Sequence, residues 1–113
     1  MSEEAQPRLE LDLPRFDIDA LDPGDPFELD AINSPHLAKH PGCDPELLYS
    51  MWASERRYFP AAHGPADWLL VADVGGECFV AALMPSTQGP AKCRPIGLRA
   101  ATGALVTAYL ESL

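Results

Sequence analysis

The strongest hydrophobic pattern lies in the second half of the chain. Residues 67–74 (DWLLVADV) and 77–84 (ECFVAALM) are nearly continuous apolar runs, and Gly75-Gly76 separates them. Two glycines between two such runs are typical of a tight β-hairpin, because its turn positions favour a positive φ. Strands that are apolar on both faces are typical of the centre of a sheet. These runs therefore predict two central antiparallel strands.

Shorter segments extend this predicted sheet on both sides. Residues 56–61 (RRYFPA) predict a strand before the hairpin, and residues 92–98 (KCRPIGL) predict one after it. Pro95 favours an edge or a bulge for that last strand, because proline cannot donate to a ladder of hydrogen bonds. Residues 27–32 (FELDAI) predict a short first strand. The small sheet is therefore expected to be mainly antiparallel.

Two helix starts with the same order of residues precede the hairpin. In the first, Asn33 or Ser34 caps the helix and Pro35 takes the first helical position; in the second, Asp44 and Pro45 have these places. Both orders are typical of helix N-termini. The second helix would lie on the core with one apolar face, formed by Leu47, Leu48, Met51 and Trp52.

The C-terminal residues predict a last helix. Thr102 is positioned to cap it, and its apolar residues recur at helical spacing: Leu105, Val106, Tyr109 and Leu110. A short strand, two short helices, a hairpin-based sheet and a terminal helix indicate an α+β fold. We expect the helices to pack on one face of the small antiparallel sheet.

Length and composition favour one small cytoplasmic domain. The chain has 113 residues and contains no apolar run long enough to cross a bilayer. Its N-terminus, MSEEAQPRLELDL, lacks the basic and apolar regions of a signal peptide. Three cysteines without a C-x-x-C pair are typical of reduced thiols in the cytoplasm. We therefore expect a cytoplasmic protein without a membrane partner.

The net charge of −9 divides the chain into two parts. Residues 1–34 hold ten acidic and two basic residues, whereas residues 35–113 hold seven acidic and six basic residues. Prolines recur through residues 1–26 and interrupt any regular element, apart from a short edge strand predicted near Leu9–Leu13. We therefore predict an acidic arm over residues 1–26, extended or disordered, and a nearly neutral domain over residues 27–113.

Metal and thiol chemistry are weaker interpretations of the polar residues. His36 and His40 lie four residues apart and Cys43 follows, which are ligand types that zinc accepts. No second cluster completes that set, and Pro41-Gly42 interrupts its geometry, so neither a metal nor a cofactor is expected. Cys93 lies between two cations in sequence, but side chains alternate along a strand and would point away from it.

Two motifs resemble those of BrnT-like toxins, a family of type II toxin–antitoxin systems. HLAKHPGCDPELL resembles the N-terminal helix pair of that family, and CRPIGLRAATGALVTAYLE resembles its last strand and helix. The hairpin between them resembles the central strands, so that the resemblance extends over about residues 27–112. The matching positions of the second motif are Arg94, Ile96, Arg99, Ala101, Thr102 and Tyr109.

The resemblance implies a RelE-like fold and a small ribonuclease that cleaves RNA, alone or on the ribosome, and inhibits translation. It also implies a co-encoded DNA-binding antitoxin as partner, for which a ribbon-helix-helix protein is one candidate. Such cleavage needs a base for the ribose 2′-OH, cations for the phosphate and an acid for the leaving oxygen. The candidate catalytic residues are Lys39, His40, Arg57, Arg94 and Arg99.

Two features depart from the family pattern and leave an alternative open. Residues 103–108 of the last helix carry no charge, and the acidic arm has no counterpart in the resemblance. The arm suggests the hypothesis of an inhibitor in cis that mimics phosphate. The alternative function is a catalytically degenerate relative that acts as a protein-interaction module. Convergence of the basic residues on one patch favours the enzyme, and scattering or pairing with the arm favours the module.

Overall fold

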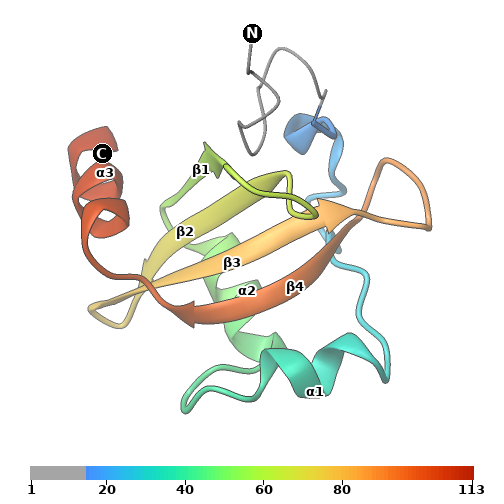
Figure 1. The fold of residues 1–113 in the computed structure, drawn as a ribbon, viewed down its shortest axis with the longest axis horizontal. Coiled ribbons are helices and arrows are strands. Elements are labelled where there is room, and N and C mark those ends of the chain that lie inside the picture. Colours follow the sequence, from blue (N-terminus) through green and yellow to red (C-terminus); the bar gives the residue numbers. More distant parts are fainter. Residues whose placement is uncertain (1–14) are drawn as a thin grey trace, which may run out of the picture.

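The computed structural model describes residues 15–113 and contains one four-stranded antiparallel sheet (Figure 1). The strand order β1-β2-β3-β4 follows the chain, so each strand pairs with the next one. The strands are β1 (Arg56–Pro60), β2 (Trp68–Val74), β3 (Glu77–Pro85) and β4 (Cys93–Ala100). The short edge strand predicted near Leu9–Leu13 lies outside the described residues.

The central hairpin forms as the sequence predicts. Gly75 and Gly76 join β2 to β3 with φ angles of 65° and 89°, which residues with a side chain rarely adopt. The prediction for Pro95 is also confirmed, because β4 is an edge strand and its pairing with β3 shifts register there. Leu83 pairs with Pro95 and Ala82 pairs with Gly97, which leaves one extra residue on β4.

Over residues 15–113, three α-helices and one 3₁₀ turn accompany the sheet. They are η2 (Ile18–Ala20), α1 (Asn33–Leu37), α2 (Pro45–Ala53) and α3 (Ala104–Ser112). Asp44 caps α2 as predicted, since its carboxylate accepts a hydrogen bond from the Leu47 N–H at 2.9 Å. The capping prediction for α1 is wrong, because Asp30 accepts from the N–H groups of Ile32 and Asn33, at 2.9 Å each.

The sheet has a separate apolar cluster on each face. On one face, α1 and α2 cover the larger cluster, whose buried sheet residues are Leu70, Ala72, Phe79, Ala81, Leu83, Cys93 and Leu98. On the other face, Val71 and Val80 pack with Tyr109 of α3. Figure 1 shows α2 behind the sheet and α3 at one end of it. The expectation that all helices share one face is therefore wrong.

Two further predictions about α3 are corrected. Gly103 precedes α3 with a φ of 60°, and neither it nor Thr102 caps the helix through a side chain. Leu110 is 60% exposed. The α3 helix packs against one end of the sheet, through a stripe of side chains centred on Tyr109 (Figure 1). The α3 helix therefore leaves most of this face of the sheet uncovered.

The strand predicted over residues 27–32 is reduced to one bridge between Phe27 and Cys93. After that bridge, residues 28–30 have no regular structure and residues 31–32 form a turn. Glu28 and Asp30 both form ion pairs with the guanidinium of Arg94, at 3.1 and 2.7 Å. This turn leads directly into α1.

Residues 15–26, the described part of the predicted arm, pack against the domain. Arg15 donates hydrogen bonds to the carbonyls of Asp67 and Ala61, at 2.9 and 3.0 Å. Trp52 Nε1 donates to the Pro23 carbonyl at 2.9 Å, and Leu21 is buried in the larger cluster. Residues 15–26 are therefore attached to the domain by these contacts.

Within residues 15–113, no helix combines the length and the apolar character that a membrane span requires.

Candidate functional site

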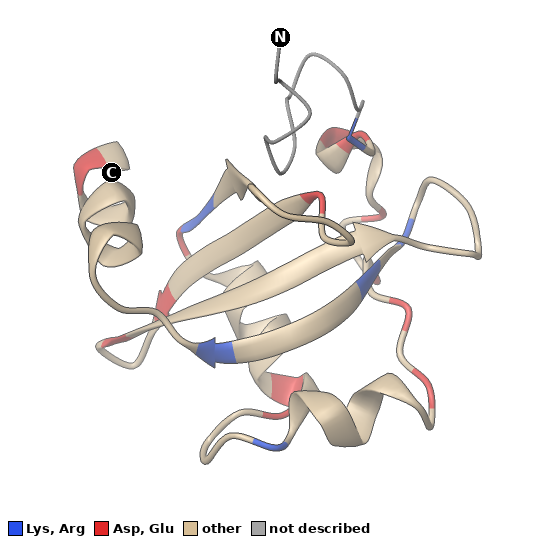
Figure 2. Ribbon diagram, viewed as in Figure 1, with Lys and Arg blue, Asp and Glu red and all other residues tan. Residues whose placement is uncertain are grey.

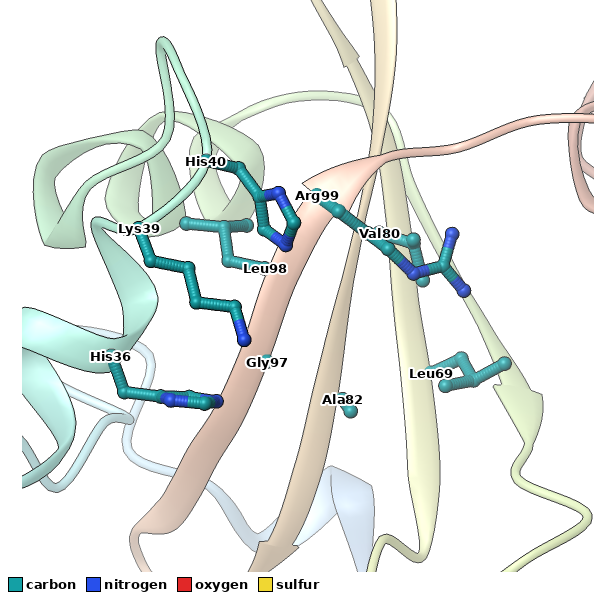
Figure 3. Close-up of a pocket in the computed structure, with 9 residues that line it drawn as sticks. All are labelled: His36, Lys39, His40, Leu69, Val80, Ala82, Gly97, Leu98 and Arg99. Carbon is teal, nitrogen blue, oxygen red and sulfur yellow. The ribbon is translucent and has the colours of Figure 1, made fainter.

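A shallow hollow of about 130 Å³ opens on the sheet face that α3 leaves uncovered, beside the β4 edge (Figure 3). The α1 segment and the turn after it provide one wall, and the middle strands provide the floor. The lining residues are His36, Lys39, His40, Leu69, Val80, Ala82, Gly97, Leu98 and Arg99.

The floor of the hollow is apolar and low because small residues meet across β3 and β4. Ala82 pairs with Gly97, and Leu69 pairs with Ala82 from the other side. A methyl group added at Gly97 would lie 3.8 Å from the Ala82 Cβ, an ordinary contact distance. Because Gly97 has no side chain, the hollow is deeper at this point, next to the wall formed by the α1 segment and the turn after it.

Nitrogen-bearing side chains form the rim of the hollow. Figure 3 shows His36, Lys39 and His40 along one side and Arg99 extending from β4 across the floor toward Leu69. Among the described residues, no carboxylate lines this hollow. Such a rim suits a phosphate, because guanidinium and ammonium groups form strong charge-assisted hydrogen bonds to anionic oxygens.

The structure thus brings three of the five predicted site residues together: Lys39, His40 and Arg99. It adds His36, which the sequence pattern suggested only as a metal ligand. The spacing of three and four residues between His36, Lys39 and His40 was the available signal, since such positions share a face of a helical segment. The α1 helix ends at Leu37, so the last two residues belong to the following turn.

Arg57 lies on the same face as the hollow but at the opposite edge of the sheet. Its guanidinium forms an ion pair with Glu55 at 2.9 Å and donates to the Ser112 carbonyl at 3.2 Å. The C-terminal end of α3 therefore occupies the space beside it. Arg57 does not line the hollow.

Arg94 lies on the far side of His36 from the hollow. It lines a neighbouring groove with Ile32, Asn33, His36 and Ile96. The hydrogen bond to Arg94 holds the pKa of the Asp30 carboxyl well below its usual range, and the same bond raises the pKa of Arg94. Arg94 is therefore ionised and already paired with carboxylates of its own chain.

Acidic residues before α1 pair with both cations at the start of β4. Lys92 Nζ lies 2.8 Å from Asp25, next to the Arg94 pairs. Figure 2 shows this series of acidic residues between η2 and α1, and basic residues at both ends of β4. The described acidic residues thus neutralise Lys92 and Arg94 at the start of β4, whereas the hollow lies near the other end of that strand.

The cysteines do not contribute an activated thiol to the site. Cys93 is fully buried, and this burial raises the pKa of its thiol to about 12. Burial also raises the pKa of Cys43 and of Cys78. Over residues 15–113, no group of three or more His, Cys, Asp or Glu side chains is placed to hold a metal ion.

In comparisons with protein-family models, curated proteins and solved structures, nothing matches this chain.

Proposed function

We propose that this protein is a metal-independent endoribonuclease of the toxin type, with a RelE-like domain, that cleaves RNA in the hollow. The observation that carries the proposal is the convergence of Lys39, His40, Arg99 and His36 around an open part of the sheet that, among residues 15–113, no carboxylate lines. The motif resemblance to BrnT-like toxins supports translation as the target process and a co-encoded antitoxin as the partner.

The proposed reaction needs only groups found on the rim. One imidazole, of His36 or His40, takes the proton of the ribose 2′-OH as its oxygen attacks phosphorus. The bond from phosphorus to the 5′-oxygen breaks, and the other imidazole gives a proton to that oxygen. Lys39 and Arg99 hold the phosphate and stabilise its developing charge. The products are a 2′,3′-cyclic phosphate and a 5′-hydroxyl end.

Imidazole suits both proton transfers, because it is the side chain that most often changes charge near neutral pH. An apolar floor strengthens the electrostatic contacts above it, because the core beneath it screens charges less than water does. The shallow shape favours single-stranded RNA, because a phosphate and an unpaired base can contact such a surface at the same time.

The test is cleavage of single-stranded RNA by the purified chain in the presence of a chelator. Arg99→Ala and His40→Ala should each lower the cleavage rate by about 100-fold, the usual effect of losing one electrostatic or acid–base group. Lys92→Ala is the matched control, because it removes a cation that pairs with Asp25 outside the hollow. A 2′-deoxy substitution at the cleaved position should abolish cleavage.

A protein-interaction module is the second candidate, and the surface of α3 favours it. Leu110 and Leu113 are 60% and 59% exposed, and α3 carries no basic residue that would face RNA. Inducing the intact chain and the Arg99→Ala variant in a bacterial host separates the candidates. Growth arrest that requires Arg99 supports the ribonuclease, whereas no arrest and no cleavage by the intact chain would favour the module.

A further inference from the structure

A buried hydrogen-bond group ties the start of α1 to the middle of β4. Asn33 is 5% exposed, and its Nδ2 donates to the carbonyls of Glu28 and Pro95, at 2.9 and 3.2 Å. Its Oδ1 accepts from the Asp30 N–H at 2.8 Å. One amide side chain therefore joins the start of α1 to residues 28–30 and to the bulged part of β4.

Asp30 adds a second link beside the first. One of its oxygens accepts from the N–H groups of Ile32 and Asn33 at the start of α1. The other oxygen lies 2.7 Å from Arg94 Nη1, so the carboxylate connects α1 to β4 through an ion pair. We call Asn33, Asp30 and Arg94 together the α1 latch.

The α1 segment depends on such links because it is very short. A helix of five residues is not stable by itself in water, so tertiary contacts decide its position. Leu37, which is fully buried, is its apolar contact with the core. His36 lies within this helix and Lys39 and His40 follow it closely. A small rotation of α1 would therefore displace all three from Arg99, which is fixed on β4.

We propose that the α1 latch is a positioning device, which sets the placement of His36, Lys39 and His40 relative to Arg99 without contacting RNA. The catalytic consequence of this inference rests on the proposed function. The inference also makes Arg94 a positioning residue, whereas the sequence predicted that it contacts RNA directly. The latch residues act only through the side chains that line the hollow.

The surroundings of Arg94 argue against a direct phosphate contact. Its side chain is 17% exposed, and its Nη1 is shared between Glu28 and Asp30. Its Nη2 donates to Asp30 at 3.2 Å. Two carboxylates in contact with one guanidinium repel a phosphate that approaches it, whereas they fix the guanidinium well as a structural tie.

The first experiment compares Asn33→Ala with Asp44→Ala in the full chain. Both remove a side chain that fixes the start of a helix, but α2, which Asp44 caps, contributes no residue to the hollow. Asn33→Ala should lower kcat for RNA cleavage at least tenfold and raise KM by a smaller factor, since Lys39 is displaced together with the imidazoles but Arg99 still holds the phosphate. Asp44→Ala should leave both constants within twofold. Equal losses of kcat in the two variants would overturn the inference.

The second experiment uses the pair of Asp30 and Arg94. If they act as one tie, Asp30→Asn and Arg94→Gln each lower kcat, and the double variant loses little more than either one. If Arg94 instead contacts phosphate, Arg94→Gln raises KM and reduces the salt dependence of RNA binding by about one unit of slope. In that case Asp30→Asn would tighten RNA binding, and the inference would be wrong.

A third measurement does not depend on activity. The imidazole resonances of His36 and His40 should shift in Asn33→Ala and stay unchanged in Asp44→Ala, with His63 of the β1–β2 connection as the internal reference. Unmoved resonances in Asn33→Ala would overturn the positioning role even if the chain cleaves RNA. Shifted resonances in a chain that cleaves no RNA would retain the role and remove only the proposed function.

Discussion

Arg57 and Arg99 stand at opposite edges of the sheet in one cross-strand row and on the same face. Arg57 pairs with Val71, Val71 pairs with Val80, and Val80 pairs with Arg99. Three interstrand steps of about 4.8 Å place their backbones roughly 14 Å apart. The two arginines differ in their surroundings, because Glu55 and the end of α3 engage Arg57, whereas Arg99 lies over the hollow.

This relationship predicts unequal roles in RNA binding. Arg99→Ala should weaken the binding of single-stranded RNA about tenfold and lower its salt dependence by about one unit of slope, as expected for a lost phosphate contact. Arg57→Ala should weaken binding less than threefold. Fluorescence anisotropy at several salt concentrations measures both effects. Equal losses would mean that the RNA crosses the whole sheet from one edge to the other.

The attachment of α3 leads to a stability prediction. Tyr109 is buried, and its hydroxyl donates to the Glu55 carbonyl at 2.6 Å and accepts from the Asp73 N–H at 3.3 Å. Tyr109→Phe should lower the free energy of unfolding by about 1–2 kcal/mol, because the Glu55 carbonyl and the Asp73 N–H both lose a part-buried hydrogen bond. Urea denaturation measures this change. Leu110→Ala is the control and should change stability by less than about 0.5 kcal/mol, since Leu110 faces solvent.

Local patterns explain why much of the sheet and α2 could be predicted. The β2–β3 hairpin follows from Gly75-Gly76 between two apolar runs, and the start of α2 follows from Asp44 before Pro45. These signals lie within a few residues of the structure they specify. Helical periodicity, by contrast, shows that α3 has an apolar face but not which side of the sheet it covers.

Long-range pairing explains what could not be predicted. Arg94 meets Glu28 and Asp30, which are 66 and 64 residues away, and no local pattern indicates this contact. The strand predicted over residues 27–32 is reduced to the single Phe27–Cys93 bridge, while the contacts of Glu28 and Asp30 with Arg94 hold this segment beside β4. The hollow could be predicted in part, because Lys39 and His40 are close in sequence, but its floor depends on the register of Gly97 with Ala82.

The burial of Cys93 predicts a thiol that is inert in the folded protein. An alkylating reagent at pH 8 should modify Cys78, which is partly exposed, faster than Cys93, because modification of Cys93 requires opening of the core. Mass spectrometry of timed samples measures both rates. Cys93→Ala should retain RNA cleavage, and loss of cleavage in a folded Cys93→Ala variant would instead support thiolate chemistry.

The carboxylate of Glu28 predicts a loss of stability in acid. Glu28 is buried and accepts hydrogen bonds from the hydroxyls of Ser86 and Thr87 and from Arg94, at 2.7, 3.1 and 3.1 Å. The Ser86 bond, more than any other contact, lowers the pKa of Glu28 below its ordinary value. The unfolded chain therefore binds this proton at a higher pH than the folded chain does.

It follows that the ionised Glu28 stabilises the fold above about pH 4.3, its ordinary pKa, and that this contribution disappears as the pH falls through the lower folded value. Glu28→Gln, which cannot ionise, should be less stable than the intact chain at pH 7. The difference should shrink as the pH falls below about 4.3. Urea denaturation at each pH measures it. A constant difference over this range would instead attribute the loss to hydrogen-bond geometry alone.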